Sequence, residues 1–191
     1  YSGNTEEVLD GLEEARKKGI ATAAIAVGGR LEEIAREYNI PFIKLPDTDI
    51  QPRSALGFSL LALVKLLGTD DEVHELHALA DVLDAGHLEP RGKDLAHQFE
   101  GKVPVIYASA RNEAVVYNWK IKCNETAKIP AFYNVFPELN HNEMTGFDIT
   151  EETHSLSEKF CVLFLHDTED DERIQKRMDV CKKLYEDRGL P

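Results

Sequence analysis

Short apolar runs alternate with helical patterns along this 191-residue chain, and the alternation restricts the fold more than any other feature. Four runs read as buried strands, at residues 20–27, 42–45, 103–108 and 160–165. Helices are predicted over residues 8–15, with Gly19 as a stop signal, and over residues 31–38, 71–83, 93–99 and 170–186. Strands that alternate with helices build parallel sheets covered by helices, so the sequence predicts the α/β class.

The strand-to-helix turn that opens the chain occurs a second time. Residues 109–113 repeat the strand, loop and helix arrangement of residues 1–7, which predicts two doubly wound units. We expect the first unit over residues 1–100 and the second over residues 101–191. Neither stretch holds a full doubly wound sheet, and the chain opens without Met, so we expect a fragment that lacks both ends.

Residues 54–67 are apolar nearly all round a helix. A helix of this kind is buried, either in the core of its own domain or in an interface such as that of an obligate dimer. The sequence leaves both alternatives open.

A net charge of −13 excludes nucleic-acid binding through phosphate neutralisation, which needs a concentrated Lys and Arg surface. The three cysteines, Cys123, Cys161 and Cys181, are odd in number and lack metal-type spacing, which predicts reduced thiols. No signal peptide or run of membrane-spanning length is predicted. We therefore expect a cytoplasmic protein with no membrane or nucleic-acid partner.

A polar stretch at residues 124–143 contains a pair of groups suited to proton transfer. Glu125 and His141 are separated by 16 residues and two prolines, and Asn side chains flank each of them. An aldose–ketose isomerisation uses such a pair, one group moving a proton between C1 and C2 and the other opening the sugar ring. The alternative is a surface helix followed by a polar loop.

The opening turn suits an anion. Ser2 and Thr5 place hydroxyls, and Gly3 a permissive backbone, at a helix N-terminus whose free N–H groups and dipole favour negative charge. This predicts a phosphate cradle. The alternative is a plain N-cap in which Thr5 or Asn4 satisfies the first turn.

Residues 2–7, Ser-Gly-Asn-Thr-Glu-Glu, resemble the phosphosugar-binding loop of the sugar isomerase (SIS) domain family. Three further stretches narrow the resemblance: Gln-Pro-Arg-Ser-Ala-Leu-Gly at residues 51–57, Asn-Glu at 124–125, and Pro-Glu-Leu-Asn-His-Asn-Glu at 137–143. Together they resemble the bifunctional phosphoglucose/phosphomannose isomerases of archaea and some bacteria. The resemblance covers essentially the whole chain.

The resemblance implies a role for each motif residue. Ser2 and Thr5 would hold the substrate phosphate, with part of that site upstream of residue 1. Arg53 would stabilise the developing enediolate, although a guanidinium paired with an acidic helix is the alternative. Glu125 would carry the proton between C1 and C2. His141 would drive ring opening and would be contributed across the interface of a homodimer.

The implied reaction interconverts glucose 6-phosphate or mannose 6-phosphate with fructose 6-phosphate through a cis-enediol, in glycolysis or gluconeogenesis. Family members of this type need no metal or cofactor, and His74 and His77 read as an exposed helix face. The family also uses a C-terminal lysine that nothing in this chain matches. Two alternatives remain: an isomerase for another phosphosugar, and a sugar-phosphate sensing domain that needs neither Glu125 nor His141.

Overall fold

The computed structural model describes residues 1–68 and 70–190. It divides into two compact units, Tyr1–Asp84 and Ala85–Pro191, and each is described by itself. The second unit begins with the helix α5 (Ala85–Gln98), whereas the sequence predicted the boundary after residue 100, just beyond the end of this helix. The assignment of domains as residues 1–100 and 101–191 stays a prediction.

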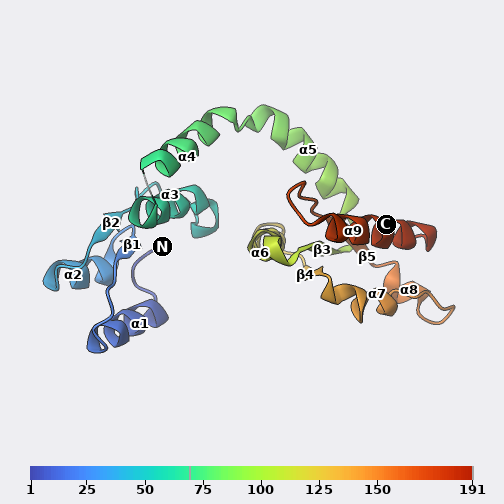
Figure 1. The fold of residues 1–191 in the computed structure, drawn as a ribbon, viewed down its shortest axis with the longest axis horizontal. Helices are drawn as coiled ribbons and strands as arrows, with labels where there is room; N and C mark the ends of the chain where they lie inside the picture. Colours follow the sequence, from blue (N-terminus) through green and yellow to red (C-terminus); the bar gives the residue numbers. More distant parts are fainter. Residues whose placement is uncertain (69, 191) are drawn as a thin grey trace. The chain divides into compact units, whose positions relative to one another are not determined.

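A short parallel sheet of β1 (Ala24–Ala26) and β2 (Phe42–Lys44) forms the centre of the first unit. The helices α1 (Glu6–Lys17) and α2 (Gly29–Glu37) flank it, and each contributes a leucine to its core (Figure 1). The strand predicted over residues 20–27 is shorter than expected. Its ladder begins only at Ala24, because β2, its partner, begins at Phe42 just after a proline.

The apolar helix of the first unit, α3 (Leu56–Leu67), is packed beside α4 (Asp70–Val82). Four of its leucines remain between 42% and 79% exposed: Leu56, Leu60, Leu63 and Leu67. The described residues therefore provide no core that covers this face. The interface that the sequence offered as the alternative stays a prediction.

The second unit is built on a parallel sheet with the order β4-β3-β5. Its strands are β3 (Val103–Ser109), β4 (Phe132–Phe136) and β5 (Phe160–Phe164). The chain leaves β3 through α6 (Glu113–Lys122) to reach β4 on one side, and then crosses to β5 on the other side. The carboxyl ends of all three strands therefore meet at one edge of the sheet.

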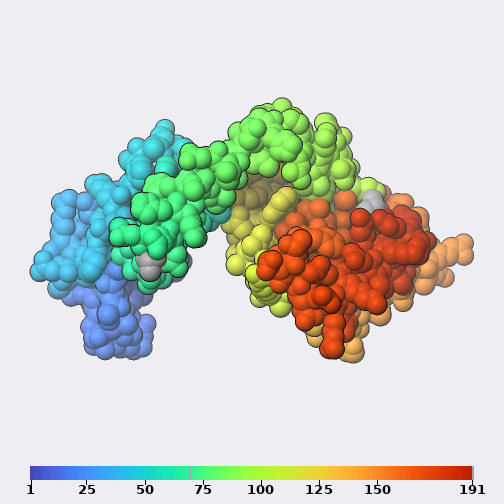
Figure 2. All heavy atoms as spheres, turned by 45° about the horizontal axis from the view of Figure 1, so that its top comes forward, coloured from blue at the N-terminus to red at the C-terminus, as the bar shows by residue number. Residues whose placement is uncertain are grey.

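Helices cover both faces of this sheet. On one face Tyr107 packs with Phe136 and Met178, the latter from α9 (Glu172–Asp187). On the other face Ile106 packs with Val116 of α6. Figure 1 shows α6 and α9 on opposite sides of the strands, and Figure 2 shows the continuous surface that α9 forms on this unit. Two covered faces explain why β3 is apolar without alternation. The predicted α/β class with parallel sheets and flanking helices is confirmed.

The strand β4 was not expected, because the polar stretch around it suggested a helix and a loop. The segment instead forms a π-helical turn at Cys123–Ala127, then β4, then a 3₁₀ turn at Glu138–Asn140. The aromatic and β-branched residues of β4 favour a strand. Asn134 interrupts them, and its side-chain N–H donates to Glu143 while its side-chain oxygen accepts from the neighbouring Val135 N–H. The alternative of a surface helix followed by a polar loop is therefore wrong at residues 132–136, where a strand replaces the loop.

Four short elements complete the described part of the chain: 3₁₀ turns at Pro52–Ser54 and Ala110–Asn112, α7 (Glu143–Gly146) and α8 (His154–Ser157). All three cysteines are unpaired in the structure, and burial raises the pKa of each thiol. That the thiols are reduced in the cell stays a prediction. Among residues 1–68 and 70–190, no helix combines the length and the apolar character that crossing a membrane requires.

Candidate functional site

The opening turn of the first unit is locked against the start of α2. Gly3 is buried with φ +81°, and a Cβ at this position would lie 1.9 Å from the carbonyl oxygen of Gly28. The Asn4 side chain accepts a hydrogen bond from the backbone N–H of Arg30 at 2.9 Å, and the Gly3 carbonyl accepts one from Leu31 at 2.9 Å. The turn therefore has a single conformation that only glycine at position 3 permits.

The two hydroxyls of this turn lie at the N-terminus of α1. Thr5 is the N-cap residue, but its side chain makes no capping hydrogen bond, and Asn4 bonds to α2 instead. The alternative of a plain side-chain N-cap is therefore wrong. Ser2 accepts a hydrogen bond from the Asn4 N–H at 3.2 Å, and both hydroxyl-bearing residues are exposed. The phosphate site at this helix N-terminus stays a prediction.

Arg53 follows β2 in the same unit, on the 3₁₀ turn that leads into α3, and is half-buried. The carboxyl ends of β1 and β2 share one edge, where Val27 donates a backbone hydrogen bond to the Tyr1 carbonyl at 2.9 Å. The turn that carries Ser2 and Thr5 therefore starts at this edge. The segment that leads to Arg53 also starts there, after Leu45, which directly follows β2. Ligands of open parallel sheets bind at the carboxyl edge.

Glu125 lies on the π-helical turn that ends α6. The Asn124 side chain closes this turn by donating to the Ile129 carbonyl at 2.9 Å, and Lys128 ends it with φ +60°. Glu125 is exposed, and its carboxylate makes no hydrogen bond or ion pair to any residue in the described ranges. A braced backbone thus carries a carboxylate that is open to solvent.

His141 follows the 3₁₀ turn after β4 and donates its backbone N–H to the Glu138 carbonyl at 2.9 Å. Its imidazole is exposed and has no hydrogen-bond partner within the described part of the chain. Two residues earlier, Leu139 is completely buried and ties the turn to the core. The turn is therefore fixed while the His141 ring is not engaged.

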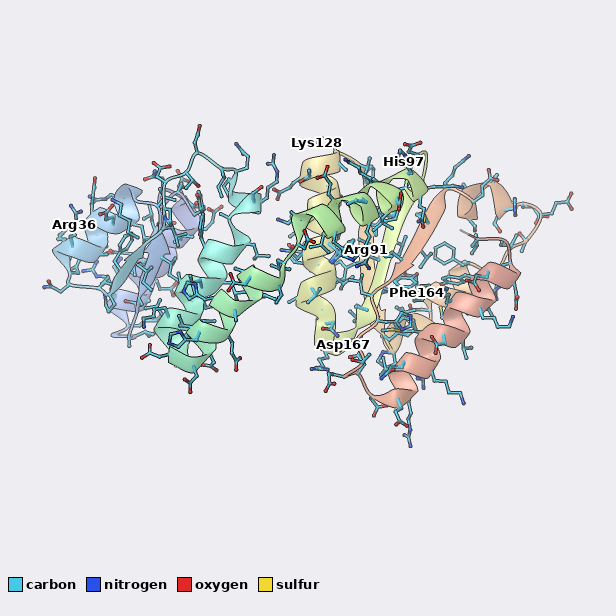
Figure 3. The ribbon with its side chains drawn as sticks, turned by 90° about the horizontal axis from the view of Figure 1, so that it is seen from above. Arg36, Arg91, His97, Lys128, Phe164 and Asp167 are labelled. Carbon is cyan, nitrogen blue, oxygen red and sulfur yellow. The ribbon has the colours of Figure 1, made fainter. Side chains whose placement is uncertain are left out.

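The structure does not bring Glu125 and His141 together within one chain. Glu125 precedes β4 and His141 follows it, and the five residues of this strand alone span about 17 Å. Figure 3 shows Lys128, which ends the turn that carries Glu125, and Asp167, at the carboxyl edge of the sheet, at opposite ends of α6. Ser2, Thr5 and Arg53 belong to the first unit and are placed only within it.

A polar cluster occupies the carboxyl edge between β3 and β5, and the sequence analysis missed it. Asn112 donates its side-chain N–H to Asp167 at 2.9 Å and to Ser109 at 3.2 Å, and Arg111 pairs with Asp167 at 3.4 Å. Asp170, 6% exposed, lies 3.4 Å from the same Asn112 nitrogen. The repeat at residues 109–113 pointed to this edge, but nothing local pairs Asn112 with a carboxylate 55 residues away. Two carboxylates here disfavour a second phosphate site.

This cluster predicts a pH dependence of stability. The Asn112 hydrogen bond, together with one from the Glu169 N–H, holds the pKa of Asp167 below its usual range, and the Arg111 charge adds to the effect. A carboxyl whose pKa is lower when folded stabilises the fold above its unfolded pKa of about 4, and this stability is lost as the pH falls through the folded value.

As the pH falls from about 6 to 2, we expect the free energy of unfolding to decrease less steeply in Asp167→Asn than in the parent. Urea unfolding of both proteins across this range measures it, with Asp179→Asn, an exposed aspartate on α9, controlling for the loss of one charge. Equal slopes for the parent and Asp167→Asn would contradict the assignment.

Residues 89–191 match the family model described as the bacterial phospho-glucose isomerase C-terminal SIS domain. Two curated relatives carry the name bifunctional phosphoglucose/phosphomannose isomerase. The one from Aquifex aeolicus is 37% identical over 192 residues, covering 100% of this chain and 58% of its own length. The one from Caldicellulosiruptor bescii is 39% identical, covering 96% of this chain and 57% of its own length. The chain thus spans less than two thirds of either relative.

A solved structure shares the fold. The C-terminal domain of glucosamine-fructose-6-phosphate aminotransferase from Francisella tularensis matches 99% of this chain and 55% of its own, with a TM-score of 0.68. The identity is 19%, so this similarity establishes the arrangement of the chain alone.

Proposed function

We propose that the protein catalyses the isomerisation of a sugar phosphate, because the chain belongs to the family of bacterial phospho-glucose isomerase C-terminal SIS domains. The reaction that we propose interconverts glucose 6-phosphate and mannose 6-phosphate with fructose 6-phosphate. The observation that carries the proposal is the presentation of Glu125 and His141. Each is exposed, without a partner in the described residues, on a turn that hydrogen bonds or buried side chains fix.

In this proposal the first unit binds the phosphate. Ser2 and Thr5 donate hydroxyl hydrogen bonds to the phosphate oxygens, and the first-turn N–H groups of α1 add theirs. The lock between Gly3 and the start of α2 supports this role, because it holds both hydroxyls at one helix N-terminus before the ligand arrives. Arg53 stabilises the negative charge that develops on the C1 and C2 oxygens.

The second unit moves the protons. His141 protonates the ring oxygen while water accepts the proton of the C1 hydroxyl, so that the bond between C1 and the ring oxygen breaks and the C1 carbonyl forms. Glu125 then takes the proton from C2 of the open-chain aldose, the electron pair forms the C1–C2 double bond, and the C1 oxygen takes a proton from water to give the cis-enediol. Glu125 returns its proton to C1 while the C2 hydroxyl gives its proton to water and becomes the carbonyl of the ketose. Glucose 6-phosphate and mannose 6-phosphate differ only in the configuration at C2. Removal of the C2 proton from either epimer gives the same cis-enediol, which is why we propose one site for both.

We further propose that the protein works as a homodimer in the cytoplasm, with His141 of one protomer facing Glu125 of its partner. The position of the two residues on opposite ends of β4 supports the dimer, and the reduced thiols support the compartment. The exposed leucines of α3 provide apolar surface of the kind that obligate interfaces bury.

The test is a coupled assay of the natural full-length protein with fructose 6-phosphate. We expect glucose 6-phosphate and mannose 6-phosphate to form together. Binding of fructose 6-phosphate without turnover would contradict catalysis and favour the sugar-phosphate sensing domain. Turnover of a pentose or heptose phosphate alone would instead identify an isomerase for another phosphosugar.

A further inference from the structure

We infer that Glu143 positions His141 for ring opening, by tying the turn that carries His141 to two strands of the sheet. The inference rests on the proposed function, because it concerns the residue that we assign to ring opening. Glu143 is the first residue of α7, two residues after His141, and is half-buried. It is a positioning residue, since we assign it no contact with substrate.

Both carboxylate oxygens of Glu143 accept hydrogen bonds from the sheet. The Tyr107 hydroxyl donates to Oε1 at 2.6 Å, and the Asn134 side-chain amide donates to Oε2 at 2.5 Å. Tyr107 and Asn134 are register partners on the adjacent strands β3 and β4. One carboxylate therefore clamps α7 to two neighbouring points of the sheet.

The two donors are themselves fixed. Tyr107 is fully buried, and its ring makes edge-on contacts with Phe136 and Phe164 at centroid distances of 6.1 and 5.6 Å. Burial raises the pKa of Tyr107 far above its usual value, so its hydroxyl keeps the proton that it donates. Asn134 uses its side-chain oxygen to accept from the Val135 N–H at 2.8 Å, which orients its amide group. A rigid sheet thus sets the position of the Glu143 carboxylate.

Hydrogen bonds of Asn142 connect this clamp to Glu138, whose carbonyl accepts the His141 N–H at 2.9 Å. The Asn142 side chain accepts from the Glu143 N–H at 2.6 Å and donates to the Glu138 carboxylate at 3.2 Å. On the other side of His141, Leu139 is completely buried in the core. The His141 backbone is therefore held between two anchors, which fix the point from which its exposed ring extends. A catalytic group displaced by about 1 Å can lose about 10²-fold in rate, so the clamp matters for chemistry.

A double-mutant cycle in the natural full-length protein tests the inference. We expect Glu143→Gln to lower kcat/KM for fructose 6-phosphate by about 10- to 100-fold in the parent, and by less than about 3-fold in a His141→Asn background. Tyr107→Phe, which keeps the buried ring and removes one donor, should show the same dependence on background. Glu151→Gln, which neutralises an exposed carboxylate of the same unit outside this network, is the matched control and should cost less than about 2-fold.

Equal fold-losses for Glu143→Gln in the two backgrounds would overturn the inference, because a merely structural effect would multiply with that of His141→Asn. No loss in the parent would overturn it as well. Amide hydrogen exchange at His141, whose N–H donates to the Glu138 carbonyl, gives a readout that needs no turnover. Exchange should accelerate at least about tenfold in Glu143→Gln but not in Glu151→Gln, and unchanged exchange would exclude the clamp. A parent without isomerase activity would refute the proposed function, whereas the exchange result would still decide whether the clamp exists.

Discussion

Glu125→Gln is expected to lower kcat for fructose 6-phosphate by about 10²- to 10⁴-fold while KM changes little, the loss typical of a removed general base. The substitution keeps the size and shape of the side chain and removes its ability to take a proton from carbon. Because Glu125 is exposed and makes no hydrogen bond within the described residues, the free energy of unfolding should change by less than about 0.5 kcal/mol.

The assay is the coupled formation of glucose 6-phosphate, with urea unfolding as the check on stability. Glu151→Gln, an exposed glutamate of the same unit, is the matched control and should keep the parent rate. If Glu125→Gln kept more than about a tenth of the parent kcat, the assignment of the base would be wrong. A large fall in stability would instead indicate that Glu125 supports the fold.

Gly3→Ala should greatly lower the stability of the first unit. The new Cβ would lie 1.9 Å from the Gly28 carbonyl oxygen, which belongs to the backbone and cannot rotate away, and φ +81° is itself unfavourable for alanine. We expect the free energy of unfolding to fall by about 3 kcal/mol or more. Fructose 6-phosphate should also bind more weakly, because the Ser2 and Thr5 hydroxyls would move with the turn.

Gly11→Ala is the matched control for this substitution. Gly11 lies within α1, and an added Cβ would meet no atom within 4 Å. Alanine at this helical position should raise the free energy of unfolding by about 0.5–1 kcal/mol. Urea unfolding and calorimetric titration with fructose 6-phosphate measure both effects. Equal stability of the two variants would contradict the lock between the opening turn and α2.

The parts of the fold that the sequence predicted are those with an uninterrupted pattern. The strand β3 was predicted because helices cover both of its faces and every residue after Val103 is buried, which leaves a continuous apolar run. The strand β4 was missed because Asn134 interrupts its apolar run. The amide is tolerated there only because Glu143, nine residues later, accepts its hydrogen bond. Such a contact has no local pattern from which to predict it.

The candidate site was predictable only as a set of residues. The motifs singled out Glu125 and His141, but their placement on opposite ends of β4 depends on a strand that was not expected. Side-chain contacts distant in sequence, such as the one between Asn112 and Asp167, were likewise missed. The helix α3 was predicted to be buried in a core or an interface, but four of its leucines are exposed in the described residues, and the interface stays a prediction.

The most direct test of the account is complementation between Glu125→Gln and His141→Asn. Each variant alone should be nearly inactive. If the two groups meet across a homodimer, one of the two sites in each heterodimer combines an intact Glu125 with an intact His141. Half of the dimers in an equal random mixture are heterodimers. The mixture should therefore regain about a quarter of the parent activity. Activity no greater than the mean of the two variants, from a mixture in which heterodimers are demonstrated, would contradict a site built from two chains.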